Sequence, residues 1–515
     1  MKKIYYSIAL MAFAALPISA QETYENTKLI DNDLNGTARY VGMGGAMEAL
    51  GADLSTMSTN PAGIGLFRKS KAETSFGLVN QQDASKFSSL SKTNASFDQA
   101  GFVYSLRNGR NSFLNFGFNY HKSRNFDQIL NASGSLSNAS QNKLTYQKFY
   151  QKFRNNVITQ STDMTYSQVD HLYKTNLIYN SDSKTYYNYP ATDYTFNQQS
   201  KGYIGEYDFN VSGNIQDRIY LGLTFGIHDV HYKGYSEYSE HFAANADNIA
   251  GSLLADDREI TGTGYDIKVG AIFRPIEGSP FRIGMYINTP TWYDLTTSNS
   301  TALIAGNKTA SVGESYDFKL YTPWKFGLSL GHTIDNFIAL GATYEYADYG
   351  TMDTRVNDGG YYDSWYDSYY ETSSSDKAMN HNTENTLKGV HTFKVGAEVK
   401  ITPQLAVRVG YNYLSAMYDK DGYKDGTLSS PGTYYASQTS YVNWKDTNRL
   451  TCGIGYSIDK FNIDLAYQYS AQNGDFHPFM NYYENQSASV EDNVASATKV
   501  SNKHSQLQLT LGYRF

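Results

Sequence analysis

Most of the chain alternates apolar or aromatic residues with small or polar ones, position by position. The final segment shows this pattern clearly: positions 507, 509, 511, 513 and 515 are Leu, Leu, Leu, Tyr and Phe, and the residues between them are polar or glycine. A period of two predicts a β-strand whose two faces meet different surroundings. Strands of about 9–11 residues with one apolar face suit a β-barrel that crosses a membrane.

The sequence predicts an all-β fold, a transmembrane antiparallel β-barrel of about 14 strands. The alternating segments are residues 71–79, 97–107, 112–121, 203–212, 219–228, 265–274, 281–288, 324–331, 338–346, 387–400, 405–413, 449–456, 461–469 and 505–515. Asn108-Gly109, between the second and third segments, is a strong signal for a tight hairpin turn. Connections after even-numbered segments are short and those after odd-numbered segments are long and polar, as periplasmic turns and extracellular loops are in such barrels.

The segment 37–67 does not alternate and is rich in Gly, Ala and Met. Its glycines permit tight turns and close backbone approach. Asn60-Pro61 and Gly63 bend the chain, because Pro fixes φ and Gly tolerates positive φ. A compact, weakly charged segment directly before the barrel strands suits the filling of a barrel lumen. We therefore expect residues 21–67 to form a small N-terminal hatch that plugs the lumen; the alternative is a Gly-rich linker before the first strand.

The first residues have the features of a secretory signal peptide. Two lysines follow Met1, residues 4–16 are apolar, and Pro17-Ile18-Ser19-Ala20 provides a cleavage site. The apolar run is too short to cross a bilayer as a helix. We expect residues 1–20 to direct export and to be removed, which leaves 21–67 as the hatch and 68–515 as a barrel with long extracellular loops.

Composition narrows the class of partner. The net charge of −7, from 43 basic and 50 acidic residues, argues against nucleic acid. The single cysteine, Cys452, excludes an intramolecular disulfide and any multi-cysteine metal site, and its place in the alternation puts it on the lipid-facing side of its strand. The 47 Tyr and 26 Phe fit the aromatic girdles of membrane barrels.

Three motifs resemble one family. The run 58–63, STNPAG, followed by Leu66-Phe67, matches the "NPA" signature in the hatch of the FadL/TodX family of outer-membrane transporters for hydrophobic compounds. Residues 321–327 resemble that family's Pro-containing start of a strand, and residues 402–411 resemble its R-x-G-Y strand. The strand that ends on Phe515 resembles the signal by which the barrel-assembly machinery recognises outer-membrane proteins.

This resemblance implies an outer-membrane location and a transport function. It implies passive, hatch-gated diffusion of small hydrophobic molecules, long-chain fatty-acid-like or aromatic compounds, through the barrel and sideways into the membrane lipid. The hatch residues that carry over are Asn60, Pro61 and Gly63. A kinked third strand would open the wall, and Gly117 with Asn119 is the expected weak point, since a Gly interrupts an otherwise regular strand. The ligand-binding residues do not carry over, because the outer loops do not match.

No motif predicts catalysis, a metal or a cofactor. The glycines from Gly42 fail the dinucleotide pattern because its sixth position is Met47. Residues 419–422 fail the EF-hand pattern. His228 and His231 lie three apart on a strand and so point to opposite faces, which argues against a metal or haem site. The acidic, aromatic stretch 358–376 could bind a divalent ion or a surface ligand, or pack its own tyrosines.

Three other functions remain open at this stage. An outer-membrane receptor for haem or another nutrient shares the architecture, but an energy-coupled receptor needs about 22 strands and a larger plug. A general porin should lack a Gly-rich hatch and should have a charged constriction. A barrel enzyme comes last, for want of a site. The sequence does not identify the transported compound or the oligomeric state.

Overall fold

The computed structural model describes residues 20–155, 166–180, 183–243, 249–335, 337–483 and 492–515. The predicted signal peptide, residues 1–20, lies outside the described residues except for Ala20. The helical elements are α1 (Thr23–Ile30), α2 (Ala38–Gly42), the 3₁₀ turns η1 (Leu54–Ser58), η2 (Pro61–Leu66) and η6 (Tyr349–Thr351), α3 (Gln141–Asn155), α4 (Gln168–Tyr173), the π-helical turn η4 (Lys174–Ile178), α5 (Lys377–Thr386) and α6 (Pro431–Tyr434).

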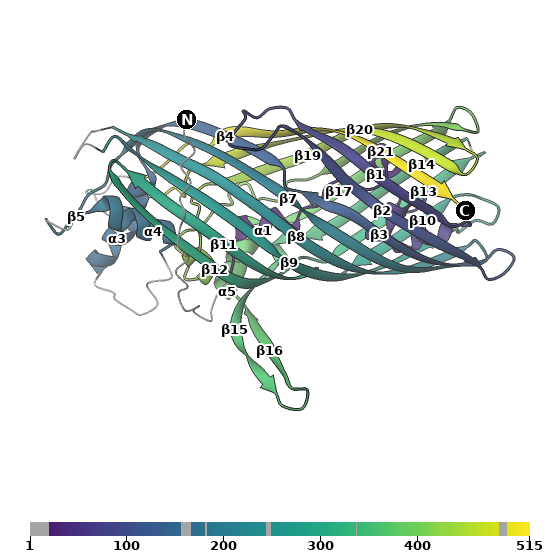
Figure 1. Cartoon of the computed structure of the whole chain (residues 1–515), viewed down its shortest axis with the longest axis horizontal. Helices are drawn as coiled ribbons and strands as arrows, with labels where there is room; N and C mark the ends of the chain where they lie inside the picture. The colour runs from purple at the N-terminus through teal and green to yellow at the C-terminus, as the bar shows by residue number, and fades with distance from the viewer. Residues whose placement is uncertain (1–19, 156–165, 181–182, 244–248, 336, 484–491) are drawn as a thin grey trace.

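In the described part of the chain, 14 antiparallel strands close into a barrel (Figure 1). They are β1 (Lys71–Gln81), β2 (Thr93–Arg107), β3 (Phe113–Asn125), β7 (Ala191–Ile215), β8 (Ile219–Phe242), β9 (Gly251–Phe273), β10 (Arg282–Asn288), β13 (Lys325–Ile334), β14 (Ile338–Asp348), β17 (Gly389–Lys400), β18 (Leu405–Leu414), β19 (Tyr441–Ile458), β20 (Phe461–His477) and β21 (Thr498–Arg514). Pairing of β1 with β21 closes the cylinder. Each predicted segment falls on one of these strands, so the predicted fold class is confirmed.

The outer half of the barrel contains strands that the sequence pattern did not predict. They are β4 (Gln128–Ala139), which follows β3 and pairs with β7, and β11 (Trp292–Ala305) and β12 (Lys308–Tyr321), which extend β10 and β13. β7, β8 and β9 are correspondingly long, at 25, 24 and 23 residues. A short two-stranded sheet, β5 (Tyr179–Asn180) and β6 (Thr185–Tyr186), lies with α3 and α4 at this end (Figure 1).

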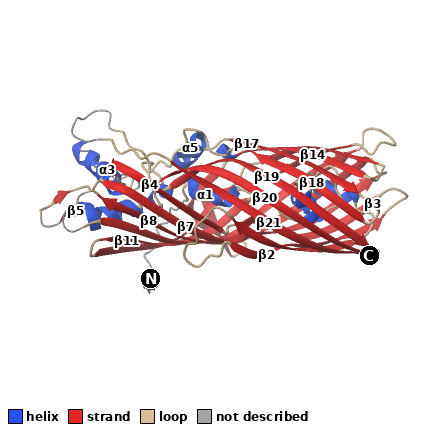
Figure 2. Cartoon of the chain, turned by 90° about the horizontal axis from the view of Figure 1, so that it is seen from above, coloured by secondary structure: helices blue, strands red, loops and turns tan. Residues whose placement is uncertain are grey.

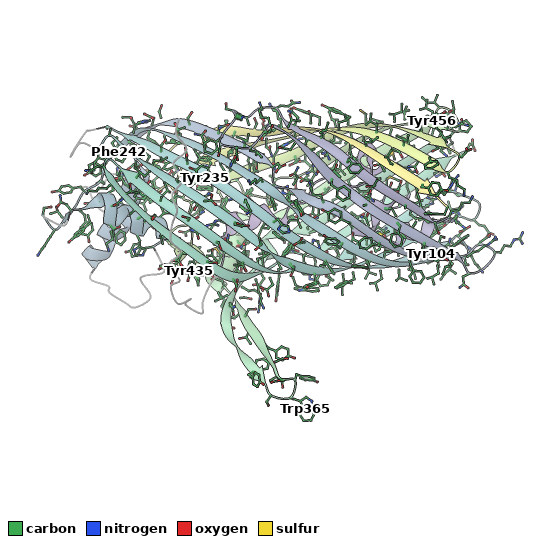
Figure 3. The ribbon with its side chains drawn as sticks, in the orientation of Figure 1. Tyr104, Tyr235, Phe242, Trp365, Tyr435 and Tyr456 are labelled. Atoms are coloured by element: carbon green, nitrogen blue, oxygen red, sulfur yellow. The ribbon has the colours of Figure 1, made fainter. Side chains whose placement is uncertain are left out.

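One hairpin projects from the wall, and only the base of this hairpin is paired with a neighbouring strand, β12. β15 (Asp353–Asp363) and β16 (Ser368–Ser375) project sideways from the barrel, and Trp365 at the tip is 87% exposed (Figure 3). Tyr361 and Tyr370 stack with ring centroids 5.6 Å apart. The acidic, aromatic stretch 358–376 is therefore a protruding hairpin followed by the start of α5, and some of its tyrosines pack on each other.

A belt of exposed apolar side chains surrounds the end of the barrel that carries the C-terminus. On β8 the outward residues Leu221, Leu223 and Phe225 are exposed, whereas from Asp229 onward the outward residues are polar. Tyr104 and Tyr456 are exposed near the end of the barrel that carries the C-terminus, at the right in Figure 3. Such a belt, edged by aromatic rings, is the lipid-facing surface of an outer-membrane barrel.

Cys452 is exposed on this apolar face, as the alternation predicted. Among the described residues, no helix is long and apolar enough to cross a membrane.

The N-terminal segment lies inside the barrel (Figure 2). α2 packs against β18, β19, β20 and β21, and η1 and η2 pack against β3, β7 and β8. Nearly all side chains from Ala20 to Leu66 are buried or half-buried. Capping side chains begin each short helix: Thr37 accepts from the Tyr40 amide, and Asp53 accepts from the Ser55 amide. Below, we call residues 20–67 the plug.

The predicted kink at Gly117 and Asn119 is wrong. Gly117 pairs with Val103 of β2 and Asn210 of β7, and Asn119 is likewise paired on both sides, so the strand is regular there. Gly117 is small for another reason: a Cβ on it would lie 2.3 Å from Cε of Met57 in the plug. The irregularity of β3 lies further along, between Lys122 and Arg124.

The lumen cavity as a candidate binding site

The plug contacts the wall through backbone, and glycines on the wall make this possible. A Cβ on Gly410 would lie 2.2 Å from the Gly44 amide nitrogen, and a Cβ on Gly341 would lie 1.9 Å from the Ala46 carbonyl oxygen. No side chain fits at such distances, so only glycine lets the two backbones meet. Within the plug, Gly44 adopts a φ of 63°, which few other residues tolerate.

The predicted hatch residues Asn60, Pro61 and Gly63 come together in one buried turn. The Asn60 side chain donates to the Glu48 carbonyl oxygen (3.0 Å) and accepts from the Ala62 amide (3.2 Å). Pro61 begins η2, where its fixed φ suits the first position and its missing N–H costs nothing. The Gly63 amide donates to the Asn60 carbonyl oxygen (3.0 Å), which closes the turn.

This turn sits against the wall at two further glycines. A Cβ on Gly222 of β8 would lie 2.3 Å from the Pro61 carbonyl carbon, and one on Gly270 of β9 would lie 2.0 Å from Oδ1 of Asn60. The Ser212 hydroxyl donates to the Pro61 carbonyl oxygen (2.8 Å). The turn is therefore locked to three neighbouring strands in the described structure.

Charged side chains tie the plug to the wall, and local sequence patterns did not reveal these pairs. Arg39 of α2 forms a two-pronged bond to Glu398, at 2.9 and 3.0 Å. Glu398 also accepts from Arg408 (2.6 Å), which in turn bonds Asp464 at 2.5 Å. The result is a buried chain of alternating charge that runs from the plug into the wall, and a paired charge avoids the large cost of an isolated one.

Glu48 makes a second anchor. Its carboxylate accepts from Lys394 (2.8 Å), the Thr343 hydroxyl (2.7 Å) and the Tyr40 hydroxyl (3.1 Å), and the residue is completely buried. Glu48 and Tyr40 belong to the plug, whereas Lys394 and Thr343 belong to β17 and β14. No local sequence pattern reveals this contact, because Thr343 and Lys394 lie 295 and 346 residues away from Glu48 along the chain.

Next to these ion pairs, the plug and the wall together line a cavity of about 270 Å³. Its plug side is formed by residues 24–35, which include α1. Part of the lining is apolar or aromatic: Leu29, Ile30, Phe126, Tyr232, Tyr418 and Trp444. Another part is polar and includes His121, Glu206, His228, Asp266 and Lys268 from four adjacent strands. The cavity is thus amphipathic rather than uniformly apolar.

α1 is fixed at the top of this cavity by aromatic stacking and ion pairs. Tyr24 stacks on Tyr418 with ring centroids 5.3 Å apart. Glu25 pairs with Lys28 (2.8 Å) and with Arg258 of β9 (3.1 Å). Burial raises the pKa of Glu25, but the charges of Lys28 and Arg258 outweigh burial and hold this pKa well below its ordinary value.

Two cations that line the cavity have no carboxylate partner within ion-pair distance in the described structure. Lys325 of β13 forms no ion pair there, and Arg449 of β19 donates only to Oδ1 of Asn412 (3.2 Å) and to the Asn32 carbonyl oxygen (3.4 Å). Both residues therefore contribute positive charge to the lining of the cavity.

The wall is incomplete beside this region. Pairing between β2 and β3 ends at Gln99 and His121, and residues 93–97 of β2 pair with β1 alone. The plug residue Asn35 lies between the separated strands and donates both to Oδ1 of Asp98 (3.3 Å) and to the Lys122 carbonyl oxygen (3.0 Å). A smaller cavity of about 90 Å³ adjoins this place.

Comparison with known proteins finds solved structures of a similar fold. No protein-family model matches the sequence, and no curated protein matches it. Among solved structures, a FadL homologue from Pseudomonas aeruginosa aligns over 94% of this chain and 100% of its own, with a TM-score of 0.50 and 12% identity. The toluene transporters TbuX of Ralstonia pickettii and TodX of P. putida give TM-scores of 0.49 and 0.48, each at 13% identity and covering 94% of this chain and 99% of theirs. The likeness to the FadL homologue confirms the predicted resemblance at the level of fold.

Proposed function

We propose that this chain transports small hydrophobic molecules across the outer membrane by passive diffusion, and that its plug gates the passage. The observation that carries the proposal is an amphipathic cavity of about 270 Å³ enclosed between plug and wall in a barrel of this fold. An apolar molecule gains free energy when it leaves water for such a cavity. The proposal includes no enzymatic activity.

The lining favours one class within the proposed range of compounds. A long-chain carboxylic acid has an apolar tail for Leu29, Ile30 and Phe126 and an anionic head for Lys325 or Arg449. A neutral aromatic hydrocarbon uses only the first set. We therefore place fatty-acid-like molecules ahead of aromatic hydrocarbons as substrates.

The route out of the cavity is proposed to be sideways. The plug fills the lumen below the cavity, which favours an exit through the wall over one straight down the barrel. The end of pairing between β2 and β3 after His121 supports an exit at this place, and Asn35 bridges it in the described state. In this proposal Asn35 moves away, while the turn at Asn60, Pro61 and Gly63 stays in place. The movement would open the gap between β2 and β3 to the outer-membrane lipid.

A further part of the proposal concerns assembly. Phe515 is 64% exposed at the end of β21, and its amide donates to the Ser70 carbonyl oxygen beside β1 (3.0 Å). We propose that this last strand is the segment that the barrel-assembly machinery recognises.

Uptake into proteoliposomes that contain the purified mature chain tests the transport proposal. We expect saturable uptake of a labelled long-chain fatty acid and negligible flux of small sugars. Combined Lys325→Gln and Arg449→Gln changes should weaken fatty-acid uptake at least about tenfold, since charge-assisted bonds contribute about 1.5–3 kcal/mol each. Toluene uptake should not change, and Lys233→Gln, an outward-facing lysine paired with Glu259, is the matched control.

Two results would contradict the proposal. Free sugar flux through the intact chain without a preference for fatty acids would make it a general porin. Absence of both fatty-acid and toluene uptake would reject hydrophobic transport and leave a larger nutrient such as haem as the next ligand to test.

A further inference from the structure

Six polar side chains meet on the lumen wall where four neighbouring strands run side by side. They are His121 of β3, Glu206 and Asp208 of β7, His228 of β8, and Asp266 and Lys268 of β9. The register sets two rows: His121 pairs with Glu206 and Glu206 with His228, and Asp208 and Asp266 both pair with Gly226. Each of the six residues is at most 6% exposed.

Gly226 provides the space in which the second row meets. A Cβ at this position would lie 2.2 Å from Oδ1 of Asp266 and 2.7 Å from Nζ of Lys268. Any larger residue would push Lys268 away from the carboxylates. The wall is therefore built so that these groups share one buried volume.

Lys268 uses one oxygen of each carboxylate. Its ammonium lies 2.6 Å from Oε1 of Glu206, 3.0 Å from Oδ1 of Asp208 and 2.7 Å from Oδ1 of Asp266. The second oxygen of each carboxylate is left over, and all three of these oxygens lie toward the two imidazoles.

The remaining donor atoms lie close together. Oε2 of Glu206 is 3.5 Å from Nε2 of His121 and 3.9 Å from Nδ1 of His228. Oδ2 of Asp208 is 3.8 Å from Nδ1 of His121, and Oδ2 of Asp266 is 3.1 Å from Nε2 of His228. Two overlapping groups of three donors result, and Glu206 belongs to both.

Several of these buried atoms have no hydrogen-bond partner among the described residues. They are Nδ1 of His121, Oδ2 of Asp208 and Nδ1 of His228. An unsatisfied buried polar group costs about 1–3 kcal/mol. Native proteins keep few such groups, and three around one carboxylate call for a bound species that satisfies them.

Charge indicates what that species is. Three carboxylates face one ammonium, so the cluster carries two excess negative charges when all three carboxylates are ionised and both imidazoles are neutral. Uncompensated charge in a buried site is costly. A divalent cation supplies the missing two positive charges and takes the lone pairs of the imidazoles at the same time.

We propose that this cluster binds one divalent transition-metal ion of the zinc type, with His121, Glu206 and Asp208 as ligands and His228 beside them. Zinc bonds imidazole nitrogen and carboxylate oxygen at about 2.0–2.2 Å, so tetrahedral ligand atoms lie about 3.4 Å apart. The observed 3.5 Å between His121 and Glu206 fits this spacing, and the ligand atoms of all three residues lie within 4.8 Å of one another, so shifts of about 1 Å bring them to it.

The donor set distinguishes this ion from calcium and magnesium. Those ions take six or more oxygen ligands, whereas imidazole prefers Zn²⁺, Cu²⁺, Ni²⁺ or Fe²⁺. His121, Glu206 and His228 line the large cavity, which gives the ion its access route. The proposal of this site does not rest on the proposed transport function, although most of its residues line the same cavity.

Titration of the metal-free protein, purified without a histidine tag, with Zn²⁺ tests this site. We expect one tight equivalent per chain, and zinc-edge anomalous diffraction should place it between β3 and β7. Combined His121→Gln and His228→Gln changes should weaken binding at least about 100-fold, because loss of even an outer-shell partner costs about 10–100-fold. His231→Gln is the matched control, since this histidine lies on the same strand but faces outward and is exposed.

Several outcomes decide the proposal. The proposal is supported if the absorption of bound Co²⁺ changes in Glu206→Gln but not in His231→Gln. It is also supported if the double variant binds no Zn²⁺ in the titration and is still folded, as judged by heat modifiability on a gel. Absence of stoichiometric Zn²⁺ binding overturns it, as does equal affinity in the double variant. Displacement of Zn²⁺ by equimolar Mg²⁺ or Ca²⁺ would also overturn it. Fatty-acid uptake measured in the metal-free chain separates failure of this site from failure of the transport proposal.

Discussion

Glu240 lies near the outer end of β8, beyond the lipid-facing part of the strand, where its carboxylate meets the start of α3. Oε1 accepts from the Gln141 amide (2.6 Å) and the Tyr238 hydroxyl (2.7 Å), whereas Oε2 has no partner among the described residues. Burial raises the pKa of Glu240 to about 7, although hydrogen bonds from Gln141 and Tyr238 act in the opposite direction. The folded protein therefore holds a proton here more tightly than the unfolded chain does.

We predict that the region around α3 becomes less stable as pH rises. The stabilisation from protonated Glu240 is complete below about pH 4.5 and is lost as pH rises through about 7, and it amounts to roughly 3 kcal/mol at most. Amide hydrogen exchange of α3 and α4, corrected for intrinsic rates, should show this loss. Glu240→Gln should remove the pH dependence; the same dependence in this variant would contradict the assignment.

The ion pair between Glu48 and Lys394 leads to a second prediction at the same scale. Glu48→Gln leaves the Lys394 ammonium buried and unpaired, which should destabilise the folded chain by about 3–5 kcal/mol. Addition of Lys394→Met removes the orphaned charge and should recover much of this loss. Thermal unfolding in detergent measures both variants. Additive losses in the double variant would show that the two side chains do not depend on each other.

The helix α2 and the turns that follow it pack directly on the backbone of the barrel strands. They can do so because the strands carry glycine at these contacts. We predict that Gly410→Val pushes the plug off β18, since a Cβ there would lie 2.2 Å from the Gly44 nitrogen. Small-sugar leakage into liposomes should then rise. Gly213→Val is the control, because a Cβ on Gly213 has nothing within 4 Å. Equal leakage in both variants would show that the close contact does not hold the plug.

The whole molecule consists of a membrane barrel and a separate N-terminal segment, the plug, that lies inside it. We predict that deletion of residues 37–67 leaves a folded barrel, because the strands pair with each other and not with the plug. The barrel should be less stable, since Glu398 and Lys394 lose Arg39 and Glu48. It should also admit small sugars, which liposome swelling can measure. An unchanged sugar flux would mean that the plug does not block the lumen.

The lipid-facing half of this molecule could be predicted from the sequence, and the physical reason is the bilayer. Residues such as Leu221, Leu223 and Phe225 must be apolar on the outside, so the alternation is strong and each predicted segment became a strand. Above the membrane the outward residues face water, as Asp229 and His231 do, and the contrast between faces fades. For this reason β4, β11 and β12 lay hidden in connections that looked like loops.

The candidate sites depend on register between distant segments, which local patterns do not contain. The alternation places His228 and His231 on opposite faces of one strand, but the neighbours of His228, namely His121 and Glu206, come from other strands. The same holds for the contact between Glu48 and Lys394. The glycine at 117 was misread for a related reason: its small size serves Met57 of the plug, a neighbour that strand periodicity cannot reveal.

The long strands set the height of the mouth. β8 continues from Asp229 to Phe242 after its outward face has become polar. At 3.3–3.4 Å per residue and a tilt of about 40°, this extension rises roughly 35 Å above the hydrocarbon. Such an extension places the opening of the barrel well away from the lipid. Under the proposed transport function, a hydrophobic molecule bound at the rim of this opening would reach the cavity within the protein wall rather than through the water around it.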